Sequence, residues 1–158
     1  LVHGPIYRPE GTMLPLVEGH AGIDVVETQN LVREIDPRRD FACRRDLARL
    51  IRERRPDVVH THSSKAGILG RAAAWSEGVP AVVHTIHGLP FHPYQSRLKH
   101  MLYVASERWA AKRCHAIVCV ADAMRDQALE QGVMERNPPL RGRFRVNIQF
   151  IFNGIPNV

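Results

Sequence analysis

Short apolar runs alternate with longer helical patterns along this chain, and this alternation constrains its fold more than any other feature. Runs rich in valine and isoleucine are typical of strands buried in a parallel sheet, and each is followed by a segment of helical periodicity. The order predicts an α/β fold, a Rossmann-like parallel sheet with helices on both faces. The expected strands are 23–27, 58–62, 81–86, 116–120 and 148–152, with 1–3 as an edge or truncated strand.

Cap and stop signals bound the expected helices. Asp36 and Pro37 open the first helix, Pro56 ends it, and Asp122 is expected to cap the last. The expected helices are 37–55, 63–78, 95–113 and 122–132. One apolar stripe of the third helix is expected to face the core. It consists of Leu98, Leu102, Ala105 and Trp109.

The charge of the chain suits an anionic partner. Twenty-two Lys and Arg against sixteen Asp and Glu give a formal charge of +6, which alone does not separate nucleic acid, an acidic membrane surface and a phosphorylated substrate. The basic stretch 38–55 favours a solvated helix face, with contact to anionic lipid headgroups as the alternative. No nucleic-acid motif accompanies it, so we expect no nucleic-acid partner.

Targeting and cysteine signals are few. No apolar run approaches the roughly 18 residues of a membrane span, and no signal peptide opens the chain. We therefore expect a cytoplasmic protein, with peripheral contact to the inner face of the membrane as a further option. The three cysteines, Cys43, Cys114 and Cys119, lack metal or disulfide spacing and are expected to be small buried residues in a reduced compartment.

Polar residues gather where the expected strands end, and ligands of open parallel sheets bind at that edge. His60 and His62 share one face of their strand because side chains alternate. Ser63 or Ser64 can cap the following helix, and Lys65 adds a cation where the helix dipole favours an anion. The segment predicts binding of a phosphate or similar ligand, and plain capping with a solvated lysine is the alternative.

The next strand ends in His84-Thr85-Ile86-His87-Gly88. Alternation places Thr85 and His87 on one side and His84 and Ile86 on the other, so one histidine is expected to reach the crevice while the other packs internally. His87 is the better crevice candidate, and an imidazole can serve as base or donor near neutral pH. Gly88 permits a sharp turn or close approach. A structural role for His87 is the alternative.

Histidines at this density also suggest zinc, with three imidazoles as ligands. The five candidates are His60, His62, His84, His87 and His92. Carboxylate partners are badly placed, because no Asp or Glu lies between Asp57 and Glu77 or between Glu77 and Glu107. We therefore expect no metal site.

Three strings together resemble a known family: "RPDVVHTHSSKAGILGRAAA", "GVPAVVHTIHGLPFH" and "IVCVADAMRDQALEQG". They are similar to the N-terminal, acceptor-side domain of retaining glycosyltransferases of family 4, which have two facing Rossmann-like domains (GT-B architecture). The likeness runs from about 31 to 132 and more weakly to "FNGIPNV" at the end. It is greatest to members that build capsule, exopolysaccharide or lipopolysaccharide.

The resemblance implies transfer of a sugar, with retention, from a nucleotide-sugar donor to a saccharide or lipid-linked acceptor, with no cofactor and no required metal. It maps His87 onto the catalytic histidine that faces the reacting sugar, and Lys65 with its serine neighbours onto the acceptor-side loop. The candidate substrate-binding residues are His60, His62, Ser63, Ser64, Lys65, Gly88, Asp122 and Asn153.

Departures from the family pattern suggest a fragment. The usual first strand and its glycine-rich loop are not found ahead of Leu1, Phe152-Asn153-Gly154 stands where Pro-Asn-Gly is common, and no nucleotide-binding domain follows Val158. We expect residues 1–152 to form the acceptor-side domain, 153–158 to begin a linker, and the fragment alone to be inactive. A non-catalytic module that binds a phosphorylated ligand or anionic surface, and an epimerase of the same architecture, stay open, as does the oligomeric state.

Overall fold

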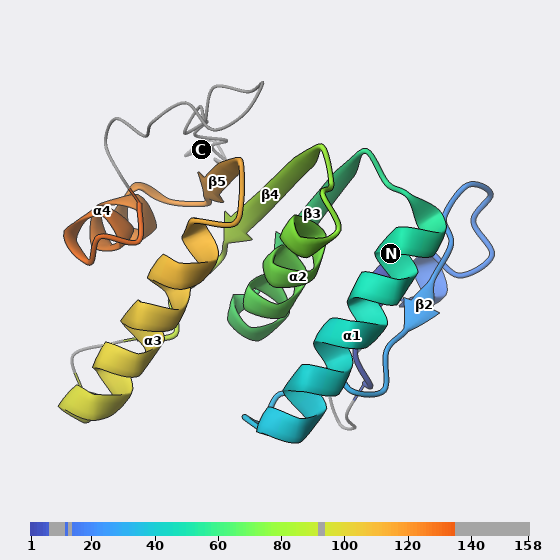
Figure 1. Cartoon of the computed structure of the whole chain (residues 1–158). Helices are drawn as coiled ribbons and strands as arrows, with labels where there is room; N and C mark the ends of the chain where they lie inside the picture. Colours follow the sequence, from blue (N-terminus) through green and yellow to red (C-terminus); the bar gives the residue numbers. More distant parts are fainter. Residues whose placement is uncertain (7–11, 13, 92–93, 135–158) are drawn as a thin grey trace.

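The computed structural model of the chain describes residues 1–6, 12, 14–91 and 94–134 (Figure 1). The expected strand 148–152, the linker 153–158 and the candidate residues His92 and Asn153 lie outside these ranges. The elements in chain order are β1 (Val2–His3), a 3₁₀ turn η1 (Leu14–Leu16), β2 (Val26–Glu27), α1 (Pro37–Arg54), β3 (Val58–His62), α2 (Ser64–Ser76), β4 (Ala81–Ile86), α3 (Arg97–Ala111), β5 (Ala116–Cys119) and α4 (Asp122–Glu130).

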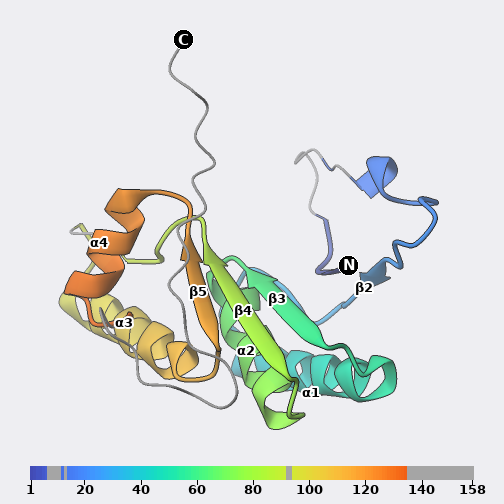
Figure 2. The same cartoon turned by 90° about the horizontal axis from the view of Figure 1, so that it is seen from above.

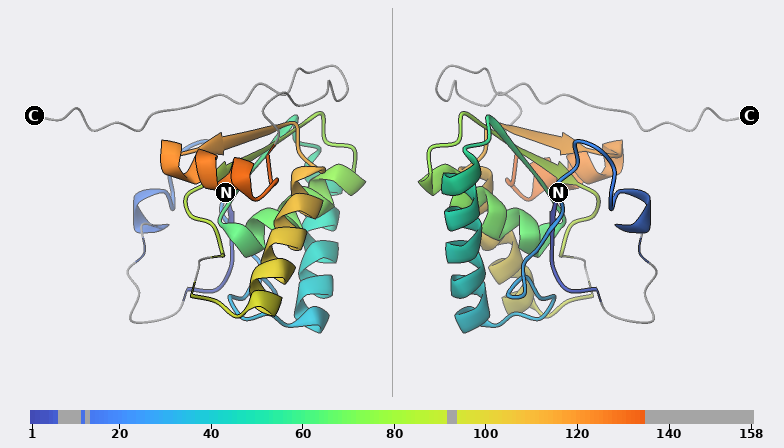
Figure 3. Two further views of the ribbon diagram at one scale, coloured as in Figure 1. Left: turned by 90° about the vertical axis from the view of Figure 1, so that its left-hand side faces the viewer. Right: turned by 90° about the vertical axis from the view of Figure 1, so that its right-hand side faces the viewer.

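The strands form two parallel sheets. β3, β4 and β5 lie side by side in that order, with Val58 opposite Ala81 and Ile86 opposite Cys119, and β1 pairs with β2. Successive crossovers step in one direction across the larger sheet, so right-handed connections place α2 and α3 on the same face. Figures 2 and 3 show α1, α2 and α3 side by side on that face. The predicted Rossmann-like α/β class is confirmed.

Helix α1 begins and ends where the sequence signals place it. The Asp36 carboxylate accepts hydrogen bonds from the backbone amides of Arg38 and Arg39 at 3.0 and 3.2 Å, and Pro37 occupies the first turn. The helix ends at Arg55, whose φ of 46° lies in the left-handed region, directly before Pro56. Local cap chemistry therefore fixes both ends of α1.

Helix α2 lies unusually close to the sheet, and two of its glycines allow this approach. A Cβ on Gly67 would stand 2.4 Å from Cε1 of His84, and one on Gly70 would stand 2.8 Å from Cγ2 of Thr61. Side chains at these positions would push the helix away from β3 and β4. The helix-destabilising effect of glycine, about 1 kcal/mol each, is offset by this packing.

The main core forms between β4, β5, α3 and α4, and a smaller cluster joins α1 to α2. All three cysteines are buried and free, which confirms their interpretation as small core residues. Burial is the main cause that raises the pKa of the Cys43 and Cys119 thiols to about 11, so both stay protonated at neutral pH.

The expected core stripe of α3 is wrong. Leu98, Leu102 and Trp109 are exposed, as is Ala105, and the helix turns Val104, Glu107 and Ala110 inward instead. The difference has a physical cause, because Glu107 is held in the interior by an ion pair that sets the rotation of the helix. The large apolar side chains of the stripe are therefore exposed.

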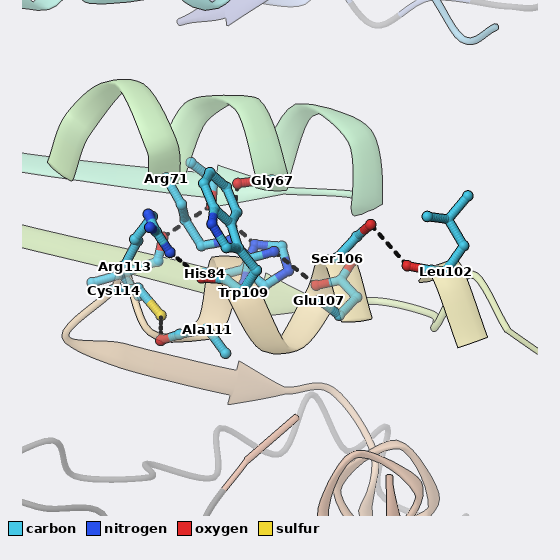
Figure 4. A network of polar contacts seen from close by, with 12 residues as sticks. Gly67, Arg71, His84, Leu102, Ser106, Glu107, Trp109, Ala111, Arg113 and Cys114 are labelled. Carbon is cyan, nitrogen blue, oxygen red and sulfur yellow. Dashed lines mark hydrogen bonds and ion pairs between the residues drawn. The ribbon is translucent and has the colours of Figure 1, made fainter. Parts of the chain in front are cut away.

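That ion pair links α3 to α2. Arg71 Nη2 lies 2.8 Å from Glu107 Oε2, and Arg71 Nε donates to the carbonyl of Gly67 at 2.9 Å. Both charged side chains are almost completely buried. Figure 4 shows the side chain of Arg71 extending from α2 toward Glu107 beside His84. Such a pair is held only where geometry and further hydrogen bonds repay the loss of water.

Breaking this pair from one side should destabilise the fold strongly. We expect Arg71→Met to lower the free energy of unfolding by about 3–5 kcal/mol, because Glu107 is left buried without a counter-charge. The double variant Arg71→Met/Glu107→Leu should recover most of that loss. Urea unfolding of both variants checks this, and a double variant as unstable as the single one would contradict it.

His84 should make stability depend on pH. Burial, followed by the nearby charge of Arg71, lowers the pKa of His84 from 6.5 to about 3. Below pH 6.5 the His84 imidazole binds a proton in the unfolded chain but not in the folded chain. The free energy of unfolding therefore falls as pH decreases from 6.5 toward 3. The His84 contribution has a slope of up to about 1.4 kcal/mol per pH unit.

The check is urea unfolding at several pH values for the unmodified chain, His84→Asn and the exposed control His20→Asn. His84→Asn should flatten the acid-side slope, although it also lowers stability near neutral pH. His20→Asn should keep the full slope. An equal slope in the unmodified chain and His84→Asn would count against the buried neutral imidazole.

Candidate functional site

Three histidines meet at the carboxyl edge of the sheet, and we call His60, His62 and His87 the histidine cluster. The register pairs His62 with Thr85, so the ends of β3 and β4 lie side by side. His62 Nδ1 lies 3.0 Å from His87 Nε2, and the ring centroids of His60 and His62 are 4.4 Å apart. The predicted shared face of His60 and His62 is confirmed.

The cluster lies on the sheet face opposite α2. Thr61 and His84 contact the glycines of α2, so the alternating residues of both strands point the other way. His84 is buried while His87 is exposed, as the alternation of β4 predicts. His60 Nε2 lies 2.7 Å from the hydroxyl of the buried Thr85, which anchors the cluster to β4.

Electrostatics keep two members of the cluster neutral. Burial is the main cause that lowers the pKa of His60 and of His62, and neighbouring imidazoles of the cluster add to it. Between His62 and His87 a single hydrogen is shared, one nitrogen donating and the other accepting. The pair therefore orients the exposed His87 ring, which is suited to hydrogen bonding or proton transfer at a bound hydroxyl or sugar oxygen.

A groove of about 910 Å³ runs along the free edge of β3. Its polar end is lined by His60, His62, Ser63 and Lys65. Its lining from α1 and β3 includes the apolar Leu47, Leu50, Ile51 and Val59 and the charged Arg54, and residues 1–6, Asp24 and Arg33 also line it. The size is within the usual range of small-molecule sites, and apolar side chains beside polar and charged ones suit an amphiphilic ligand.

Lys65 is brought to this groove with a partner that the sequence analysis missed. Its ammonium lies 2.6 Å from a carboxylate oxygen of Asp40 in the first turn of α1, and it also donates to the carbonyl of Glu34. Part of its charge is therefore neutralised within the protein, unlike the unpaired cation that the sequence predicted. Asp40 stands 25 residues earlier, and no local pattern joins the two.

Ser63 has a strained backbone at the entrance to α2. Its φ of 60° and ψ of 163° lie in a region that is almost exclusive to glycine. Neither predicted serine cap is made, because Ser63 occupies the N-cap position without a side-chain cap bond and Ser64 is the first helical residue. Such strain persists only where the surroundings determine it, and it concentrates at functional sites.

Gly88 and Asp122 have other surroundings than expected. Nothing lies within 4 Å of the position a Cβ on Gly88 would take, so the expected close approach is not seen, while the backbone does bend at His87 and Gly88 without a left-handed φ. Ala121, not Asp122, occupies the N-cap position of α4. Asp122 instead forms an ion pair with Arg125 at 2.8 Å. Gly88 follows His87 of the histidine cluster directly in the chain, whereas no hydrogen bond or ion pair among the described residues joins Asp122 to the cluster.

Metal-ligand geometry is not seen at the cluster. Among the residues that the structure describes, no group of three or more His, Cys, Asp or Glu side chains is arranged to hold a metal ion. No helix of the described ranges combines the length and apolar character needed to cross a bilayer.

Comparison with known proteins decides the family. The sequence profile of Glycosyltransferase Family 4 matches residues 6–138, which is most of the chain. The chain belongs to glycosyltransferase family 4. A relative from Escherichia coli, named UDP-Gal:alpha-D-GlcNAc-diphosphoundecaprenol alpha-1,3-galactosyltransferase, is 41% identical over 90 residues. This segment is 57% of the chain and 23% of the relative's length.

The family 4 match spans α1 to α4 and therefore contains the whole histidine cluster. Two functional candidates were missed by sequence reasoning. Thr85 was noted only for its side of the strand, and it holds His60. Asp40 holds Lys65 at the groove. The Thr85–His60 contact depends on the register of β3 with β4, and the Asp40–Lys65 contact depends on the packing of α1 on α2. Neither arrangement can be inferred from spacing along the sequence.

Replacing Ser63 with glycine should stabilise this family 4 chain. We expect Ser63→Gly to raise the free energy of unfolding by on the order of 1 kcal/mol, because glycine adopts the strained backbone freely. The control Ser63→Ala should change stability little, since the Ser63 side chain makes no cap bond. Ser64→Gly, at the first helical residue, should lower stability slightly, because Ser64 has no left-handed backbone to relieve and glycine disfavours the helix.

Chemical denaturation of the three variants supplies the comparison. If Ser63→Gly destabilises the chain as much as Ser64→Gly does, the backbone at Ser63 is not strained.

Proposed function

We propose that this chain is the acceptor-side half of a retaining glycosyltransferase, which transfers a sugar from a nucleotide-sugar donor to a saccharide or lipid-linked acceptor. The single observation that supports it best is the His62–His87 hydrogen bond at the carboxyl edge of the sheet, beside a groove. Family membership favours glycosyl transfer over the module and epimerase alternatives. His87 is the proposed catalytic residue. His62 orients the His87 ring through their hydrogen bond, and His60 packs beside His62.

The chemistry needs a group that stabilises the reacting sugar. The bond from the anomeric carbon to the nucleoside diphosphate breaks, positive charge develops on the sugar ring, and the acceptor hydroxyl passes its proton to the departing phosphate oxygen as the new bond forms on the same face. An oriented imidazole can donate or accept a hydrogen bond at a sugar oxygen. It accelerates transfer only if that bond is stronger in the transition state than in the ground state.

The groove supports a lipid-linked acceptor. The relative's name specifies a GlcNAc-diphosphoundecaprenol acceptor and a UDP-Gal donor, and we extend that class of acceptor to this chain. The sugar and diphosphate would lie at the end formed by His62, Ser63 and Lys65, and the first lipid units along Leu50 and Val59. Because Asp40 partly neutralises the charge of Lys65, the polar end of the groove is suited to a group that is bound by hydrogen bonds as well as by charge.

The reaction is proposed to take place at the cytoplasmic face of the membrane without a divalent metal or other cofactor. Because the matched segment covers 23% of the relative, we expect most donor contacts to come from other parts of such an enzyme. The 158 residues alone should therefore not transfer sugar.

His87→Ala in the full-length protein that contains this chain should lower the transfer rate by on the order of 10²-fold or more. The KM for the nucleotide sugar should change much less, since His87 acts on the reacting sugar. The control His20→Ala, an exposed histidine in the turn before β2, should leave both unchanged. Lys65→Ala should act chiefly on acceptor affinity.

Steady-state kinetics with UDP-sugars and a GlcNAc-diphosphate-lipid acceptor, with and without EDTA, measure these effects. Unchanged turnover in His87→Ala would show that His87 has a structural role and not a catalytic one. Interconversion of the sugar nucleotide without acceptor would support the epimerase, and loss of activity in EDTA would contradict the metal-free reaction.

A further inference from the structure

The two ring nitrogens of His87 have different surroundings. Nε2 lies 3.0 Å from Nδ1 of His62, which is hydrogen-bond distance. A ring nitrogen makes one hydrogen bond in the plane of the imidazole, either as an N–H donor or through its lone pair. His62 therefore occupies Nε2, whereas Nδ1 forms no hydrogen bond with the described residues. The exposed His87 ring can offer only Nδ1 to a ligand.

The His62 ring is itself held in place by contacts on both strands. Its centroid lies 4.4 Å from that of His60 and 5.3 Å from that of His87, so it contacts two other imidazoles. The His60 ring is fixed in turn, because its Nε2 lies 2.7 Å from the hydroxyl of the buried Thr85. A ring that is both packed and hydrogen-bonded keeps one rotamer. His62 therefore presents Nδ1 to His87 in a fixed orientation.

The number of hydrogens on the pair determines what it can bind. Burial is the main cause that lowers the pKa of His62, which favours the neutral ring. When both rings are neutral, two hydrogens are distributed over four nitrogens, and one of them lies in the shared bond. The other is carried by His87 Nδ1 or by His62 Nε2. Of these two free nitrogens, one donates and one accepts, which suits hydroxyl groups better than a phosphate, since phosphate oxygens only accept.

We propose that His62 is a positioning residue for His87, which occupies Nε2 and so makes Nδ1 the atom through which His87 contacts an uncharged oxygen of a bound sugar. The identity of this ligand rests on the proposed glycosyl transfer, whereas the pairing of the two rings does not. Without His62 the His87 ring could turn over and exchange the places of its two nitrogens. Holding one orientation before the sugar binds removes that freedom from the barrier to reaction.

Amide side chains can replace the two ring nitrogens separately. The asparagine amide lies as many bonds from Cβ as Nδ1 does, and the glutamine amide lies as many bonds from Cβ as Nε2 does. Each amide can both donate and accept a hydrogen bond. His62→Asn can therefore keep the bond to Nε2 of His87, whereas His62→Gln displaces it. At position 87, asparagine keeps the group that meets the ligand, and glutamine keeps the group that meets His62.

Steady-state kinetics of the full-length protein that contains this chain test the positioning role. His62→Ala and His62→Gln should each lower kcat by on the order of tenfold, as expected for one lost hydrogen bond, with little change in the KM for the nucleotide sugar. His62→Asn should lower kcat clearly less. His87→Asn should keep more activity than His87→Gln. In a His87→Ala background the three His62 variants should have equal rates, because His62 acts through His87.

The opposite order in either series would overturn the proposal, as would equal rates of His62→Asn and His62→Gln. A difference between the His62 variants that persists in the His87→Ala background would show that His62 acts directly or through the fold. Thermal midpoints serve as the control for a structural role. Because the His62 side chain is exposed, its variants should keep the midpoint of the unmodified protein, and kcat losses that follow the midpoint would also overturn the proposal.

Nitrogen-15 NMR of the imidazoles in the 158-residue chain tests the pairing without any reaction. His62 Nδ1 and His87 Nε2 should give one protonated and one unprotonated signal. His62→Ala should release His87 into a mixture of tautomers with averaged signals, and His62→Asn should keep it in one tautomer. His115 is the internal reference, because its Nδ1 accepts from the amide of Val82 at 2.9 Å and should not change in any variant.

The two measurements separate failure of this inference from failure of the proposed function. Averaged His87 signals in the unmodified chain would overturn the pairing, whatever the activity of the full-length protein. Fixed His87 signals together with unchanged turnover in His87→Ala would overturn glycosyl transfer through His87, and the positioning role with it. Nδ1 would then still be the free nitrogen of the pair.

Discussion

The buried ion pair between Arg71 and Glu107 is the constraint on which the described structure depends most. A charge pair removed from water is tolerated only in a fixed geometry, so α2 and α3 cannot slide or rotate independently. On α3 the pair turns Glu107 inward and the apolar stripe outward. On α2 it holds the helix through Arg71 and the carbonyl of Gly67.

The position of α2 also determines which face of the sheet carries the histidine cluster. Gly67 lies against His84 and Gly70 against Thr61, so these side chains occupy the helix-covered face of β3 and β4. Alternation then leaves the opposite face to His62 and its partners. A core contact on one side of the sheet thus determines which imidazoles are available on the other, although no atom of α2 contacts the His62–His87 pair in the hydrogen bonds described.

Sequence signals correctly predicted the features that depend on neighbouring residues alone. The Asp36 cap, the strand ends and the division between buried His84 and exposed His87 follow from capping and alternation, and the structure confirms them. The α3 stripe failed because periodicity assumes that apolar residues face the core, whereas here the interior takes the charged Glu107. The pairing of Lys65 with Asp40 and the backbone of Ser63 failed for another reason, since each depends on tertiary packing that spacing does not contain.

The basic character of the chain is distributed unevenly, and the distribution separates two roles. At the groove the lysine is matched by Asp40, so the candidate site is close to balanced and suits recognition by oriented hydrogen bonds. On α3 the helix's own carboxylate is consumed in the core, and its cations border an apolar stripe instead. Most of the remaining excess lies on α1, whose seven arginines outnumber its three carboxylates.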